Sequence, residues 1–283
     1  MKIFVDCTRA AIGDCFFASS LAKCLKTQYI GCEVFYYIPL VQPLLLLQQN
    51  PYIDGVSTVR PITYRDFDLV INIPEVNQSF PATLWMQSQA GIPEEFQELA
   101  FEVYTVSDFD DIARDNADHF RSTSGKKVIT YQSDWEWRSY ACTPETLAQG
   151  IGAPHRNMAR ILSELRNEYF MIRCGFDRTV NNFNPSAADA VGYAKTASII
   201  KASEYFLGAE GGLQNLAASV GTKTIYTTDF IHQNYGINGR IRKCDPPQMG
   251  SCVYFPSAGH TALDPCIKDE DITSTIKGII NGH

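Results

Sequence analysis

The chain has 283 residues, of which 45% are hydrophobic and 19% are charged, so it is a globular chain with room for two domains of ordinary size. Its formal net charge of −7 argues against a nucleic-acid-binding surface, because such surfaces usually carry an excess of basic residues. The nine cysteines are odd in number and include no CxxC pair, which indicates a reducing compartment with most thiols buried.

The first half of the chain alternates strand and helix patterns. The apolar run at the start ends at Asp6, so it is a strand and not a signal peptide. The expected strands of this half are residues 3–5, 33–37, 55–59 and 68–73, and the expected helical segments are residues 14–26 and 43–49. Such alternation predicts a parallel, doubly wound sheet.

The middle of the chain changes character at residues 106–127, which hold several aspartates followed by RSTSGKK. This polar run predicts an interdomain linker. A second α/β series follows, with expected strands at 128–131, 169–174, 204–207 and 223–226 and expected helices at 154–167, 187–201, 213–220 and 272–280. The sequence therefore predicts two domains, residues 1–122 and 123–283, with the last helix packing back on the first domain.

A glycine-rich turn, residues 208–221 (GAEGGLQNLAASVG), joins a strand to a helix in the second half. Such a turn lies at the carboxyl edge of a parallel sheet, where open α/β sheets bind ligands. Gly211 and Gly212 leave room for a phosphate or a sugar to approach the backbone amides, and Glu210 sits beside them. The alternative is a tight turn whose glycines serve only the backbone conformation.

A second unusual turn, residues 10–17 (AAIGDCFF), links the first strand to the first helix. Asp14 follows Gly13 at the helix N-terminus, where the macrodipole favours an ionised carboxylate. One interpretation is a helix cap. The other is a general base that faces the glycine turn of the second domain across a cleft.

Other signatures of chemistry are missing from the sequence. It holds no GxGxxG, GxxxxGK[ST], HExxH or GxSxG motif, and its histidines lack metal-ligand spacing. Cys244, Cys252 and Cys266 fit no zinc pattern, so no metal is expected. An aromatic group after the strand at 128–131 could belong to the core or stack on a nucleotide base, and it comprises Tyr131, Trp135 and Trp137.

Four stretches, in order, resemble the heptosyltransferase-type glycosyltransferases of glycosyltransferase family 9, which have the GT-B fold. They are residues 12–26 (IGDCFFASSLAKCLK), residues 50–56 with 66–73 (NPYIDGV and DFDLVINI), residues 202–230 (ASEYFLGAEGGLQNLAASVGTKTIYTTDF) and residues 264–280 (DPCIKDEDITSTIKGII). The resemblance implies two Rossmann-like domains with parallel sheets facing a central cleft. It covers nearly the whole chain, which is short for the family.

The resemblance also implies roles for single residues. Asp14 matches the general base, and Gly211 and Gly212 match the residues whose amides bind the diphosphate. Glu210 stands where an aspartate binds the donor sugar, and Asn215 stands where a histidine is usual, so the donor sugar stays open. The predicted donor-binding set is completed by Gly13, Ser133, Arg138 (a basic residue that meets the phosphates), Asp177 (a carboxylate that binds ribose), Leu213 and Gln214.

Together these features predict inverting transfer of a sugar from a nucleotide-diphosphate sugar to an acceptor hydroxyl. The expected partners are that donor substrate and a glycan or other hydroxyl acceptor, with no further cofactor and no metal. Two alternatives stay open, a nucleotide- or sugar-binding protein without catalysis and a sugar-nucleotide epimerase or hydrolase on the same fold. The longest aliphatic run, residues 44–47, is too short to span a bilayer, so we expect a cytoplasmic protein for which contact with a membrane surface stays open.

Overall fold

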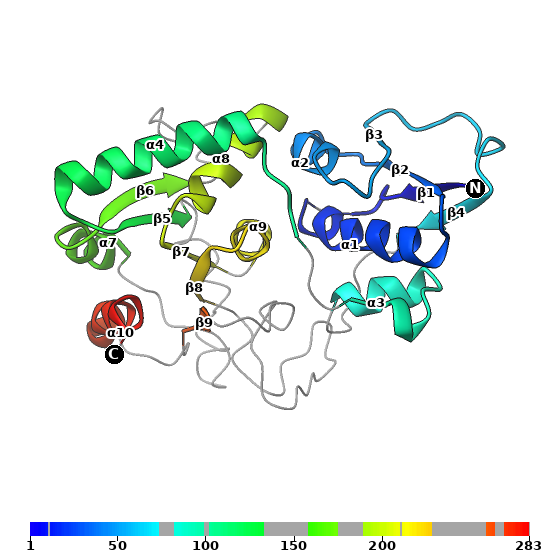
Figure 1. The fold of residues 1–283 in the computed structure, drawn as a ribbon. Coiled ribbons are helices and arrows are strands. Elements are labelled where there is room, and N and C mark those ends of the chain that lie inside the picture. Colours follow the sequence, from blue (N-terminus) through cyan, green and yellow to red (C-terminus); the bar gives the residue numbers. More distant parts are fainter. Residues whose placement is uncertain are drawn as a thin grey trace, which may run out of the picture.

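The protein folds into two α/β units, each built around a parallel sheet (Figure 1). The computed structural model describes residues 1–10, 12–73, 82–98, 102–132, 158–174, 189–209, 211–227, 259–263 and 269–282. The alternating patterns in the sequence are confirmed, because every strand predicted within these residues forms and pairs in parallel.

The first sheet has the strand order β3-β2-β1-β4. Its strands are β1 (Lys2–Asp6), β2 (Glu33–Tyr37), β3 (Gly55–Ser57) and β4 (Leu69–Asn72). The register runs from Lys2 opposite Glu33 to Asp6 opposite Tyr37. The helical segments of this unit are α1 (Ile12–Gln28), α2 (Leu44–Gln48), α3 (Ala82–Gln89) and the short 3₁₀ turn η1 (Glu94–Phe96).

The second sheet has the strand order β6-β5-β7-β8-β9. Its strands are β5 (Val128–Gln132), β6 (Phe170–Cys174), β7 (Tyr205–Ala209), β8 (Lys223–Thr227) and β9 (His260–Ala262). Its helices are α4 (Ser107–Ser124), α7 (Met158–Arg166), α8 (Ala190–Lys201), α9 (Gly212–Ser219) and α10 (Asp269–Asn281).

One apolar core runs through both units. It joins buried residues of β1 and α1 to residues of α8 and α9, and the rings of Phe16 and Tyr193 stack across the junction with centroids 6.0 Å apart. A smaller core lies on the other face of the second sheet, between β5, α7 and α10. The shared core holds α1 against α9, which matters for the site described below.

The linker predicted for residues 106–127 is wrong, because residues 107–124 form helix α4. Two aspartates in its first turn, Asp108 and Asp110, complement the positive end of the helix dipole. Gly125 ends the helix in the left-handed conformation, with φ of 67°, and its amide bonds to Arg121 O. Gly125 in the polar run therefore caps the C-terminus of α4 and does not indicate a linker.

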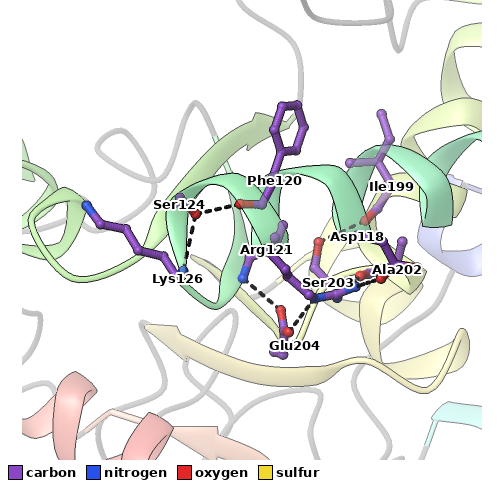
Figure 2. Close-up of polar contacts among 10 residues, drawn as sticks. Asp118, Phe120, Arg121, Ser124, Lys126, Ile199, Ala202, Ser203 and Glu204 are labelled. Carbon is purple, nitrogen blue, oxygen red and sulfur yellow. Dashed lines mark hydrogen bonds and ion pairs between the residues drawn. The ribbon is translucent and has the colours of Figure 1, made fainter.

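Helix α4 is fixed to the second unit at both ends. Near its start, Asp110 accepts hydrogen bonds from Ser198 at 2.6 Å and from Lys201 at 2.7 Å. Near its end, Arg121 donates to Glu204 Oε1 at 2.7 Å and to Ala202 O at 2.6 Å, while Glu204 Oε2 accepts from the amide of Val128 (Figure 2). These contacts place α4 with the second sheet, so the boundary expected after residue 122 lies before this helix.

The last helix also differs from expectation. Residues 272–280 are helical, but α10 contacts α7 and buries Ile272, Ile276 and Ile280 in the smaller core of the second unit. The expected return to the first unit is therefore wrong for this helix. Its apolar side chains pack with those of α7 and β5, so they are buried within the second unit.

Candidate functional site

Each of the two sheets has one point at which the strand order reverses. In the first sheet, β2 and β3 extend from one side of β1 and β4 pairs on the other, so the strand order reverses beside β1. In the second sheet, the order reverses between β5 and β7. Ligands of open α/β sheets bind outside the carboxyl ends of the strands at such points. Helix α1 follows β1 and helix α9 follows β7, so both helices begin at these positions.

The N-terminus of α1 carries Gly13 and Asp14. The chain leaves β1 at Asp6, turns, and enters the helix at Ile12, which places Asp14 in the first helical turn. Asp14 is partly buried, whereas residues 15–22, which follow it in α1, are buried. A carboxylate at this position is stabilised by the dipole of α1.

The N-terminus of α9 carries the glycine pair. Gly211 is the N-cap, and its φ of 150° and ψ of −164° belong to a region that favours glycine. Gly212 begins the helix, and the amide of Asn215 bonds to Gly211 O at 2.9 Å. The early amides of α9 have no carbonyl partner inside the helix, as in every helix N-terminus.

The two helix N-termini meet. A Cβ atom built on Gly13 would lie 3.7 Å from Gly212 Cα and 3.5 Å from Asn215 Nδ2, and one built on Gly212 would lie 3.8 Å from Gly13 N. Figure 1 shows α1 and α9 facing each other where the two units join. Two positive dipole ends at one place favour an anion there.

Asn215 adds a polar group to this junction. Its side chain is only 5% exposed, and its Oδ1 atom has no hydrogen-bond partner among the residues that the structure describes. The neighbouring Gln214 is fully buried as well. A buried amide oxygen without a donor costs free energy, so the Asn215 side chain suits a ligand that donates a hydrogen bond.

A second carboxylate at the end of β1 was missed in the sequence. Asp6, 2% exposed, accepts from the amide and hydroxyl of Thr8, from Arg60 Nη2 at 2.9 Å and from the Tyr64 hydroxyl at 2.8 Å. Burial alone would raise the pKa of Asp6, but these hydrogen bonds lower it below its ordinary value. A carboxylate stabilised in this way is a poor proton acceptor, so its role is to fix the turn after β1.

Two buried thiols flank the Asp14 turn. Cys7 and Cys15 share a hydrogen bond, which together with burial and the nearby Asp6 and Asp14 raises the pKa of Cys7 well above its ordinary value. Protonated thiols are weak nucleophiles and weak metal ligands. Among the described residues no cluster of histidine, cysteine and carboxylate side chains could hold a metal ion. Cys244, Cys252 and Cys266 lie outside these residues.

The structure brings together seven of the predicted site residues, Gly13 and Asp14 on α1 and Gly211, Gly212, Leu213, Gln214 and Asn215 on α9. The other four, Ser133, Arg138, Asp177 and Glu210, lie outside the described part of the chain. Of the aromatic group, Tyr131 packs in the smaller core and so has the structural role, whereas Trp135 and Trp137 are also outside. For Asp6, the sequence signal was a charged residue ending an apolar strand, but nothing in the sequence indicated Arg60 or Tyr64 as its partners.

Comparison with known proteins gives structural relatives only. A scan against protein-family models finds no match, and a search of the curated proteins finds none. Among solved structures, the chain is similar over its full length to a glycosyl transferase of family 9 from Veillonella parvula, with a TM-score of 0.61, 12% identity and 97% of that chain covered.

Two Escherichia coli proteins are also similar over the full chain, with 99% of each covered. ADP-heptose LPS heptosyltransferase II has a TM-score of 0.59 at 13% identity, and the heptosyltransferase WaaC, with ADP-2-deoxy-2-fluoro heptose, has a TM-score of 0.55 at 8% identity. The predicted GT-B fold and the resemblance to heptosyltransferase structures are confirmed by these matches. No helix in the described ranges is both long and apolar enough to cross a membrane.

Proposed function

We propose that this protein is an inverting glycosyltransferase that uses a nucleotide-diphosphate sugar. The observation that carries the proposal is the contact between the N-termini of α1 and α9, which brings Asp14 and the Gly211–Gly212 pair to one place. The GT-B fold shared with glycosyltransferase structures supports it.

The donor diphosphate would bind at the start of α9. The amides of Gly211, Gly212 and Leu213 supply hydrogen-bond donors, and the dipole of the helix favours the negative charge. The dipole of α1 adds to this field from the opposite side. Because the neighbour WaaC was solved with ADP-2-deoxy-2-fluoro heptose, ADP-sugars are the first donors to test.

Asp14 would act as the general base. The acceptor hydroxyl oxygen attacks the anomeric carbon and forms the new glycosidic bond, and the bond from that carbon to the diphosphate oxygen breaks. The hydroxyl proton goes to Asp14, and the nucleoside diphosphate leaves with the electron pair. Attack from the face opposite the leaving group inverts the anomeric carbon.

The charge of the leaving group would be stabilised by fixed groups of the protein. The amides and dipole at the start of α9 are in place before the reaction, so they cost no reorganisation in the transition state. In this scheme the two helix N-termini meet the need for positive charge, and we propose a metal-independent reaction.

The experiment begins with a thermal-shift screen of nucleoside diphosphates and nucleotide sugars. A ligand at one hundred times its Kd stabilises the folded protein by about 2.7 kcal/mol. Transfer from the best donor to sugar acceptors is then measured for the wild type and for Asp14→Asn.

Asp108→Asn is the matched control, because Asp108 also lies in the first turn of a helix, at the start of α4. We expect Asp14→Asn to lose transfer by about 10²- to 10⁴-fold with unchanged donor affinity, and Asp108→Asn to retain activity. A donor that binds without any transfer would favour a binding protein, and product release without an acceptor would favour a hydrolase.

A further inference from the structure

A cavity of about 530 Å³ lies at the outer edge of the second sheet, away from the junction of α1 and α9. It extends around the edge strand β6, from α4 and the end of α8 on one face of the sheet to Tyr131 and Arg166 on the other. Figure 1 shows α4 running along β5 and β6 on this side of the unit. Its volume falls within the range of about 300–1,000 Å³ that is typical of small-molecule sites.

Small side chains on α4 create the space. Ala113 and Ala117, one turn apart, are the buried residues of this helix and face the sheet. The helix cannot move inward to fill the gap, because Asp110 and Arg121 fix it at its two ends. The cavity is therefore held open by polar contacts on either side of it.

The part of the cavity under α4 is mainly apolar. The rings of Phe120 and Phe170 stack with centroids 4.2 Å apart and planes 16° apart, and Ile172 and Ile199 extend the same surface. Figure 2 shows Phe120 and Ile199 projecting from the side opposite the Arg121–Glu204 contact. Such walls favour an alkyl chain or another apolar body over water.

The end of the cavity on the α7 side of β6 carries positive charge. Arg166 is exposed there and donates a hydrogen bond to the Tyr131 hydroxyl at 3.0 Å, with its guanidinium carbon 6.0 Å from the centre of that ring. No carboxylate in the described part of the chain pairs with Arg166, whose guanidinium has five N–H donors. Arg173 also lines the cavity.

We propose that this cavity binds a single-chain anionic amphiphile, an alkyl carboxylate whose tail lies against Phe120, Phe170 and Ile172 and whose head group meets Arg166. An apolar interior beside a cation that has no acidic partner among the described residues fits both the tail and the head group of such a ligand. No residue of the α1–α9 junction lines this cavity, so the proposal does not depend on the transferase activity.

The first test measures binding of octanoate, decanoate and dodecanoate to the full chain by titration calorimetry, below their micellar concentrations. Each buried methylene should strengthen binding about fourfold, so each step of two carbons should lower Kd about fifteenfold until the cavity is full. Absence of binding by all three, or a Kd that does not depend on chain length, overturns the proposal.

Variants then locate the site. Arg166→Gln removes the head-group partner from an exposed position and should weaken decanoate binding roughly tenfold while leaving decanol binding unchanged. Ala117→Phe fills the cavity and should abolish binding of both. Because a larger side chain can destabilise the fold, Ile172→Gln, on the edge strand, is the second cavity variant.

Arg114→Gln is the control, since Arg114 is on α4, its side chain is 61% exposed, and its one ion pair among the described residues is with Asp111 on the surface. Decanoate affinity equal to wild type in both Arg166→Gln and a folded cavity variant overturns the proposal. The proposal is also overturned if light scattering shows that the wild type is a dimer and Ala117→Phe is a monomer with unchanged affinity for decanoate. The cavity would then belong to a contact between two copies of the chain.

Discussion

The substitution Gly212→Ala tests whether the glycine is needed for the backbone conformation or for binding of the diphosphate. In Gly212→Ala the new Cβ would lie 3.8 Å from Gly13 N, which is ordinary van der Waals contact. Gly212 is helical and is not among the glycines with positive φ. Alanine in a helix is favoured over glycine by roughly 0.5–1 kcal/mol, so the variant should fold with unchanged or slightly higher stability.

The same methyl group would lie at the start of α9, beside the amides to which we propose that the diphosphate binds. A phosphate oxygen needs to come within about 3 Å of an amide nitrogen to accept its hydrogen bond. Losing one charge-assisted hydrogen bond costs about 1.5–3 kcal/mol, which corresponds to roughly a 10- to 100-fold weaker Kd.

The assay pairs urea denaturation with calorimetric titration of the best nucleoside diphosphate from the screen. Gly212→Ala should show a midpoint of unfolding at or above the wild-type value together with the weaker binding. Wild-type affinity in the folded variant would refute the placement of the diphosphate at Gly212. A large loss of stability would instead refute the steric argument.

The remaining predictions concern stability and thiol chemistry. Arg121→Met should lower the free energy of unfolding by about 1–2 kcal/mol in urea titrations, because the contacts of Arg121 with Glu204 and Ala202 are partly shielded from solvent. The control Arg114→Met removes an exposed ion pair and should lower the free energy of unfolding by less than about 0.5 kcal/mol. Equal losses in the two variants would contradict the role of Arg121 in fixing α4. Asp6 has a lowered pKa in the folded protein, so its contribution to stability is full above the unfolded pKa of about 3.9 and is lost as the pH falls through the folded pKa. The stability difference between wild type and Asp6→Asn should therefore be constant near neutral pH and shrink below about pH 4, and a difference that does not depend on pH would show that Asp6 acts through packing alone. Cys7 and Cys15 should resist iodoacetamide at pH 8 in the native protein and react after unfolding, as measured by mass spectrometry of peptides, because both thiols are buried and the pKa of Cys7 is raised. Rapid labelling of Cys7 in the native protein would contradict its raised pKa.

The sequence determined the elements and their class. Apolar strands such as residues 33–37 and 128–132 form because their side chains favour a buried, extended backbone, and the helices between them follow from 3.6-residue periodicity. It also indicated both turns of the candidate site, since a glycine beside a helix start has a local cause that does not depend on the rest of the fold. The sequence was misleading at residues 106–127, where a polar composition hid a helix that buries only two alanines.

Tertiary structure alone decided which distant residues meet. Gly13 and Gly212 are far apart in the chain and come into contact because one apolar core joins α1 to α9, and no local pattern encodes that pairing. The partners of Asp6 come from a loop more than fifty residues away, and the cavity under α4 exists because Asp110 and Arg121 hold the helix at both ends. Local propensities determine the helices and strands. The contacts between distant residues depend on how helices and sheets bury their apolar faces against one another, and this is a property of the whole folded chain.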